Sequence, residues 1–137
     1  MLRLLVLSAA FALFGVSANA GDPIVTVELN KLEPNGDACR AYLMLHNGAG
    51  AAFDSLKLDL VLLDNDGIVA NRLAVETAPL KAGKTSLKVF DFADQQCGEV
   101  GRVLLNDVLA CHDNNGPRQD CLDVVAPTSL GSVAFIK

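Results

Sequence analysis

Apolar and polar side chains alternate at every second position along most of this chain. The clearest case is "SLKLDLVLLD" (55–64), in which four leucines from Leu56 to Leu62 share one face while Lys57 and Asp59 lie on the other. A period of two is typical of a β-strand with one buried face. The same pattern predicts further strands at 23–32, 38–47, 68–77 and 86–92.

Turn residues separate these runs. "PNGD" (34–37) and "DNDG" (64–67) are tight hairpin signals, because Asn-Gly and Asp-Gly tolerate the positive φ that such turns need. "PLKAGKT" (79–85) predicts a longer turn before the strand at 86–92.

The stretch that follows Cys97 is ambiguous. Apolar residues from Val100 to Cys111 fall at helical spacing, yet Val103, Leu105 and Leu109 fit a strand. β-Branched residues and the glycines at its start favour a strand at 101–110. One short helical turn is predicted near 119–124, and "GSVAFIK" (131–137) is predicted as the last strand.

About seven short strands, with turn signals every ten residues or so, predict an all-β fold. We expect an antiparallel, immunoglobulin-like β-sandwich. The Cys–Trp–Cys signature of true immunoglobulin domains is missing, because the chain has no tryptophan.

The first twenty residues have the three parts of a Sec-type signal peptide. Arg3 supplies the positive charge, Leu4 to Val16 form the apolar stretch, and Ala18-Asn19-Ala20 is a cleavage site. The apolar stretch is shorter than the ~20 residues that span a bilayer, and no later segment approaches that length. Residues 1–20 are therefore predicted to be removed, which leaves 21–137 as one domain without membrane insertion, in the bacterial periplasm or outside the cell.

The mature chain is acidic. The leader holds one of the 11 basic residues and none of the 16 acidic ones, so residues 21–137 carry a formal charge of −6. Nucleic acids and anionic membranes bind basic surfaces, so neither is an expected partner.

All four cysteines lie in the mature chain, which predicts two disulfides in an exported protein. Four cysteines allow three pairings. We predict Cys111–Cys121, because the intervening "HDNNGPRQD" contains an Asn-Gly-Pro turn, and Cys39–Cys97, because Cys39 shares the core face of its strand.

Three stretches carry a resemblance to a known group. The run from "AYLMLHN" (41–47) through "LDLVLLDNDGIVA" (58–70) to "LKAGKTSLKVFDF" (80–92) resembles FxLYD-like exported β-sandwich domains. These share a strand ending in Asn, an acidic-Gly hairpin and an apolar-x-x-Gly turn. "GRVLLNDVLAC…DCLDVV" is similar to small alphaproteobacterial exported proteins described only by their signal sequence. The resemblance implies a non-catalytic accessory or binding domain and carries over no functional residue.

Metal and enzyme motifs fit poorly. An EF-hand with Gly116 at its sixth position would have Cys111 first and Leu122 last, and neither serves as its ligand. No C-x-x-C pair, G-x-S-x-G motif or phosphate-binding glycine loop is present. We therefore predict no catalytic residues and no cofactor.

Two functions follow as hypotheses. The first is a non-catalytic exported domain that binds a protein or a cell-envelope component, with a sheet edge as one route of binding. The alternative is a periplasmic metal-binding protein that uses His46, His112 and the acidic loops, since histidine and carboxylate are common ligands of copper and zinc.

Overall fold

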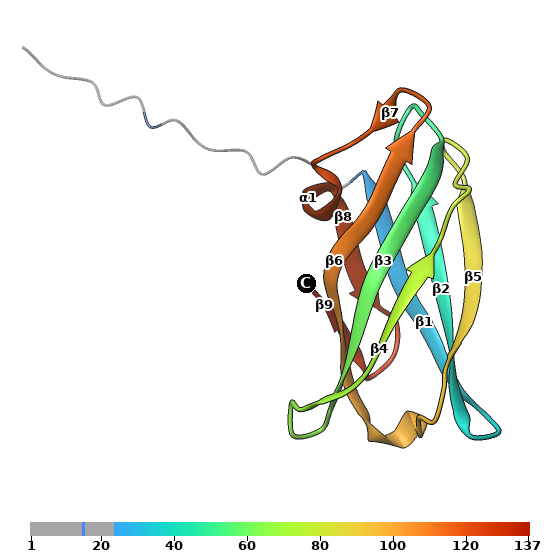
Figure 1. The fold of residues 1–137 in the computed structure, drawn as a ribbon, viewed down its shortest axis with the longest axis vertical. Helices are drawn as coiled ribbons and strands as arrows, with labels where there is room; N and C mark the ends of the chain where they lie inside the picture. The colour runs from blue at the N-terminus through green and yellow to red at the C-terminus, as the bar shows by residue number, and fades with distance from the viewer. Residues whose placement is uncertain (1–14, 16–23) are drawn as a thin grey trace, which may run out of the picture.

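Two β-sheets packed face to face make up the described part of the chain (Figure 1). The computed structural model describes Gly15 and residues 24–137, so the predicted signal peptide (1–20) lies outside it apart from Gly15. The elements are β1 (Val25–Asn35), β2 (Ala38–Asn47), β3 (Phe53–Asp64), β4 (Val69–Glu76), β5 (Thr85–Phe92), the 3₁₀ turn η1 (Cys97–Glu99), β6 (Val100–Asp113), β7 (Gly116–Pro117), α1 (Cys121–Val124), β8 (Val125–Ser129) and β9 (Ala134–Ile136).

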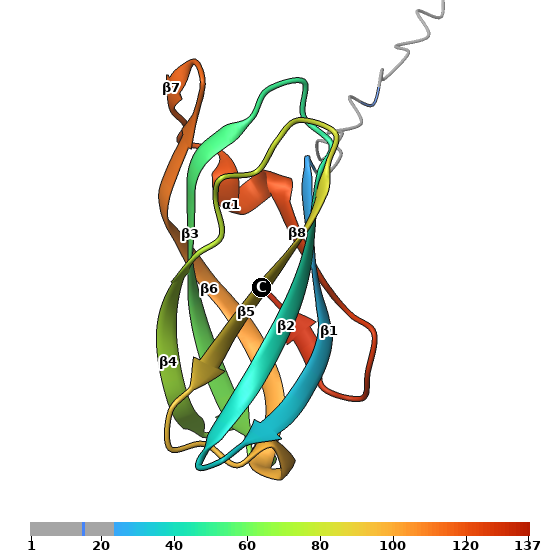
Figure 2. The same ribbon diagram turned by 90° about the vertical axis from the view of Figure 1, so that its right-hand side faces the viewer.

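The first sheet has the strand order β5-β2-β1-β8. The second has the order β4-β3-β6, and both β7 and β9 pair with β6. Figure 2 shows the two layers from the side that carries β4 and β5. The predicted β-sandwich is confirmed.

The core lies between the sheets and follows from the alternation. Each buried aliphatic side chain contributes about 1.5–3 kcal/mol, so the inner faces supply most of the stabilisation. The largest fully buried side chains are Phe53, Phe92, Leu43, Leu45, Leu56, Leu58, Leu60, Leu62, Leu80, Leu105, Val25 and Val27.

The expectation of purely antiparallel sheets is wrong, because β8 runs parallel to β1 and β9 runs parallel to β6. The backbone N–H of Ile24 donates to the carbonyl of Val124 at 2.8 Å, so β1 and β8 start side by side. Both strands then leave this point in the same direction. The chain next crosses between the layers, and β9 joins the second sheet.

The described chain has nine strands, not about seven. The extra strands are β8, whose "VAPTS" lacks clear alternation, and the two-residue β7. The predicted strand at 101–110 is confirmed and extends over Val100–Asp113, whereas the last strand shrinks to Ala134–Ile136. The predicted helical turn is confirmed as α1.

Candidate binding groove beside the Cys111–Cys121 loop

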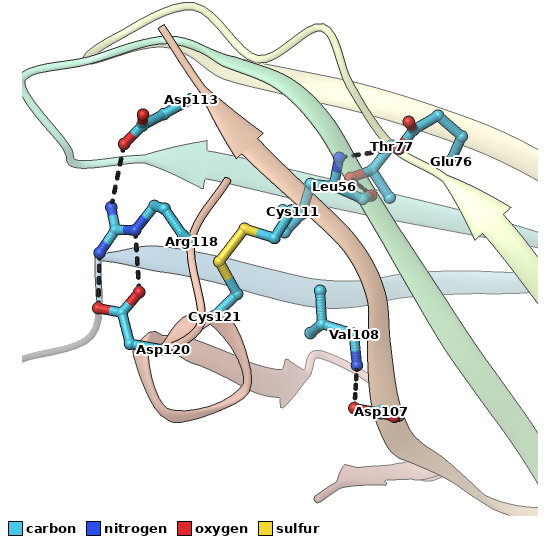
Figure 3. Close-up of a disulfide and its surroundings, with 10 residues drawn as sticks. All are labelled: Leu56, Glu76, Thr77, Asp107, Val108, Cys111, Asp113, Arg118, Asp120 and Cys121. Carbon is cyan, nitrogen blue, oxygen red and sulfur yellow. Dashed lines mark hydrogen bonds and ion pairs between the residues drawn. A yellow bond between two sulfur atoms is a disulfide. The ribbon is translucent and has the colours of Figure 1, made fainter. Parts of the chain in front are cut away.

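The Cys111–Cys121 loop projects from the end of β6 (Figure 3). The chain turns at Asn114 and Asn115, and Gly116 takes a φ of +108°, which favours glycine. β7 then returns antiparallel to β6, and the N–H of Arg118 donates to the carbonyl of Cys111 at 3.0 Å. These contacts bring the two ends of the loop together.

Both predicted disulfides are present, Cys39–Cys97 and Cys111–Cys121. Cys111 and Cys121 are buried, with their Cα atoms 6.5 Å apart. The second disulfide therefore joins the end of β6 to the start of α1 as a covalent staple. Paired cysteines also indicate an oxidising compartment.

Arg118 organises the polar side of the loop. Its Nε and Nη2 donate to the two carboxylate oxygens of Asp120 at 2.9 and 2.7 Å, and Nη1 lies 3.7 Å from Oδ2 of Asp113. The guanidinium also stands 5.7 Å from the ring centroid of Phe53. Hydrogen bonds from Arg118 hold the pKa of the Asp120 carboxyl below its ordinary value.

Asp113 serves the same loop. Its Oδ1 accepts from the N–H of Asn115 at 2.8 Å, and its side chain is largely buried. Asp113 and Asp120 are the two carboxylates of the segment between the paired cysteines. Their oxygens stabilise the turn and neutralise Arg118, so neither is a free ligand or base.

A groove lies between the outer face of β6 and the segment that returns from β7 to α1. It is a hollow of about 400 Å³, with Leu109 and Leu122 among its lining side chains. These two leucines remain 50% and 37% exposed. The full lining is Asp107, Val108, Leu109, Ala110, Cys111, His112, Pro117, Arg118, Gln119, Cys121 and Leu122. A second hollow of similar volume shares Leu122 and reaches Leu104 and Lys137.

A β-bulge places Leu109 in this groove. On β3, the neighbours Lys57 and Leu58 pair with Ala110 and Val108, so Leu109 is an extra residue without a cross-strand partner. A bulge bends the strand and redirects the side chain of its extra residue. The sequence analysis did not predict this groove. The signal that could have indicated the bulge is the irregular spacing of apolar residues in "NDVLAC" (106–111).

The two histidines of the metal hypothesis lie on opposite outer faces of the sandwich. His46 belongs to β2 in the first sheet, where its Nδ1 lies 3.1 Å from Oγ1 of Thr85. His112 belongs to β6 in the second sheet and points out beside the groove. Within residues 24–137, no three His, Cys, Asp or Glu side chains gather as metal ligands would.

The acidic β3–β4 turn is held by its own side chain. Oδ1 of Asp64 accepts from the backbone N–H groups of Asp66 and Ile68, both at 2.9 Å. Hydrogen bonds from an Asp side chain to the backbone of its own turn are expected for "DNDG". They occupy the carboxylate oxygen of Asp64 that faces the loop.

Asp59 is a buried carboxylate that the sequence pattern placed at an exposed position. It points to the outer face of β3, but its side chain is only 3% exposed because Arg72 covers it. Arg72 donates to its two oxygens at 2.8 and 2.7 Å, and Asn106 adds a third bond at 2.7 Å. These bonds, the ones from Arg72 first, lower the pKa of Asp59.

Comparison with known proteins supports the fold of this chain and nothing more specific. No family model and no curated protein matches the chain. The solved structure of IrmA from Escherichia coli is similar, with 16% sequence identity, a TM-score of 0.53, and coverage of 75% of this chain and 89% of that one. At this identity the likeness shows a shared fold alone, and the FxLYD-like resemblance stays a prediction.

The described residues also contain no helix of the length and apolarity needed to cross a membrane. α1 has four residues.

Proposed function

We propose that this protein is a non-catalytic exported accessory domain that binds a protein partner in the groove beside the Cys111–Cys121 loop. The observation that carries the proposal is the exposure of Leu109 on β6 and Leu122 on α1 in one hollow, beside the buried disulfide that joins these two elements. Binding sites combine apolar contact area with a rigid frame, because a preformed site loses little entropy on binding.

The composition of the groove favours protein over other partners. Leu109 and Leu122 offer apolar contacts, while Asp107 and Gln119 supply a polar rim. Arg118, the one arginine among the lining residues that the structure describes, is neutralised by Asp120. Among residues 24–137, the groove lining therefore offers phosphate groups of nucleic acids or lipids no arginine or lysine without a carboxylate partner.

The polar residues of the groove support binding without catalysis. His112 makes no side-chain hydrogen bond to a carboxylate or hydroxyl group among residues 24–137, and Asp113 and Asp120 are engaged by the loop. A nucleophile needs a base within hydrogen-bond reach, and the base needs a group that orients it.

Export is supported from two directions. The two disulfides fit an oxidising compartment, and residues 1–20 have the charge, apolar stretch and Ala18-Asn19-Ala20 site of a signal peptide. We place the mature chain, from Gly21, in the periplasm or outside the cell.

Site-specific photo-crosslinking in the producing cell tests this proposal. A benzophenone amino acid in place of Leu109 is expected to give one major adduct with another exported protein, and the additional substitution Leu122→Asp is expected to abolish it. The matched control carries the same group at Val69, which is exposed on β4 outside the groove. Equal adducts from both positions, or no adduct from position 109, would overturn the proposal.

A further inference from the structure

β5 forms an open edge of the first sheet. Within the described chain it pairs with β2 alone, over Thr85 to Phe92. It lies on the side of the sandwich away from α1 (Figure 1), and Leu122 of α1 lines the groove. An open edge leaves a row of backbone donors and acceptors that another strand can use.

The ladder identifies which groups are open. The N–H of Asn47 donates to the carbonyl of Lys84, and Asn47 and Lys84 continue the register in which Leu45 faces Ser86 and Leu43 faces Lys88. Hydrogen-bonded pairs alternate along an antiparallel ladder. Ser86, Lys88 and Phe90 therefore bond to β2, whereas Leu87 and Val89 direct their N–H and C=O groups to the open edge.

The same two residues present apolar side chains. Leu87 and Val89 point to the outer face of the sheet and are 56% and 41% exposed. Their cross-strand neighbours are Met44 and Tyr42, so the apolar surface continues from β5 onto β2. An added strand would gain cross-strand apolar pairs as well as backbone bonds.

Lys88 selects what can pair here. It lies between the two residues on the core-facing side of β5, opposite Leu43, and none of the ion pairs among residues 24–137 includes it. A lysine at this place disfavours pairing with an apolar or basic strand. A carboxylate directly opposite would complement it.

The same lysine disfavours a second copy of this chain. A second β5 would have to pair through residues whose backbone groups face the open edge. Among these residues, only one antiparallel register sets both Leu87 and Val89 against apolar partners, and it pairs Leu87 of one copy with Val89 of the other. That register also places Lys88 of one copy directly opposite Lys88 of the other. Like charges in this position are destabilising.

We propose that β5 accepts an extended segment of another protein as a fifth strand of the first sheet. The segment carries apolar side chains opposite Leu87 and Val89 and an Asp or Glu opposite Lys88. This binding surface is separate from the groove, so either can fail without the other.

Hydrogen exchange of the full chain with a synthetic strand tests the inference. The probe is a blocked peptide, Thr-Val-Thr-Val-Glu-Val-Thr-Val-Thr, at millimolar concentration, and the matched control peptide has Lys in place of Glu. The Glu peptide is expected to slow exchange of the Leu87 and Val89 amides, at a concentration about three- to ten-fold lower than the Lys peptide. Lys88→Glu is expected to reverse that preference.

Two further variants test the backbone contact. Leu87→Pro removes an N–H that points away from β2, a change that an edge strand tolerates. This variant is expected to abolish protection of the Val89 amide by the Glu peptide. Leu87→Thr keeps the N–H and is expected to retain it, as is the groove variant Leu122→Asp. The inference would be overturned if the Glu peptide gave no protection, or if both peptides protected wild type and Lys88→Glu equally. It would also be overturned if the free protein showed protection together with the mass of a dimer.

Discussion

Gly101 has no room for a side chain. A Cβ atom added there would overlap the carbonyl oxygen of Asp64 and lie 2.7 Å from its carbonyl carbon. We expect Gly101→Ala to lower the free energy of unfolding by about 1–3 kcal/mol, as for other overpacked sites. Chemical denaturation measures this change.

Gly98 provides the matched control for that variant. It lies three residues earlier, and an added Cβ would meet nothing within 4 Å. Gly98→Ala is expected to stay within about 0.5 kcal/mol of the parent. Equal stability of the two variants would contradict the steric argument.

Asp59 makes stability depend on pH. Its hydrogen bonds from Arg72 and Asn106 lower its pKa in the folded state. A carboxyl with a lowered folded pKa contributes fully above its unfolded pKa, about 3.9, and that contribution is lost as the pH falls through the folded pKa. Wild type should therefore be more stable than Asp59→Asn at neutral pH, and the difference should shrink on acidification.

Urea denaturation from pH 7 to pH 2 measures that difference. Asp54→Asn, at an exposed position on the same strand, is the control and should follow wild type throughout. A gap between wild type and Asp59→Asn that stays constant with pH would contradict the role assigned to the ionised carboxylate.

The loop between β6 and α1 depends on its disulfide. Loop-closure entropy predicts that replacing Cys111 and Cys121 with Ser costs roughly 3 kcal/mol. In a domain of about 100 residues this corresponds to a fall in the thermal midpoint of roughly 12–24 °C. Calorimetry under non-reducing conditions measures it.

His112→Ala is the control for the disulfide variant, since the side chain is exposed, and it should change stability by no more than about 0.5 kcal/mol. Asp113 is unsuitable as a control. Its side chain is largely buried and accepts a hydrogen bond from the N–H of Asn115. A double-cysteine variant that melts like the parent would contradict the staple.

The ambiguous pattern of β6 has a structural cause. Register shifts against β3 insert extra residues near Gly101, Asn106 and Leu109. Each bulge moves the next core residue from the second position to the third. The core side of the strand therefore reads Val100, Val103, Leu105, Val108 and Cys111, a spacing that imitates a helix. The spacing of apolar residues therefore does not by itself distinguish this bulged strand from a helix, and the strand prediction depended on the β-branched residues and glycines.

The mass of the whole molecule tests the proposed signal-peptide cleavage and the disulfides together. Cleavage after Ala20 and two disulfides predict a chain of residues 21–137 with four hydrogens fewer than the reduced form. Intact mass spectrometry of protein recovered from the periplasm or medium measures both. Retention of residues 1–20, or free thiols at the four cysteines, would contradict export or the disulfide assignment respectively.

The two layers are held together by contacts between segments far apart in the sequence. Cys39–Cys97 links β2 to η1, across a sequence separation of 58. Lys137, which follows β9, makes a second such contact, because its Nζ donates to the carbonyls of Leu122 and Val125 at 2.7 and 2.8 Å. The last residue thus caps α1, as a cation does at a helix C-terminus.

The sequence by itself determined what depends on near neighbours along the chain. The buried faces of β1, β2 and β3 follow from period two, and the hairpin turns follow from residues such as Gly36 and Gly67, which take positive φ. Tertiary structure decided the direction of β8 and β9, the burial of Asp59, the groove at Leu109 and the open edge of β5. Each of these depends on which distant strand becomes the neighbour, and a repeating pattern of apolar and polar positions carries no information about that choice.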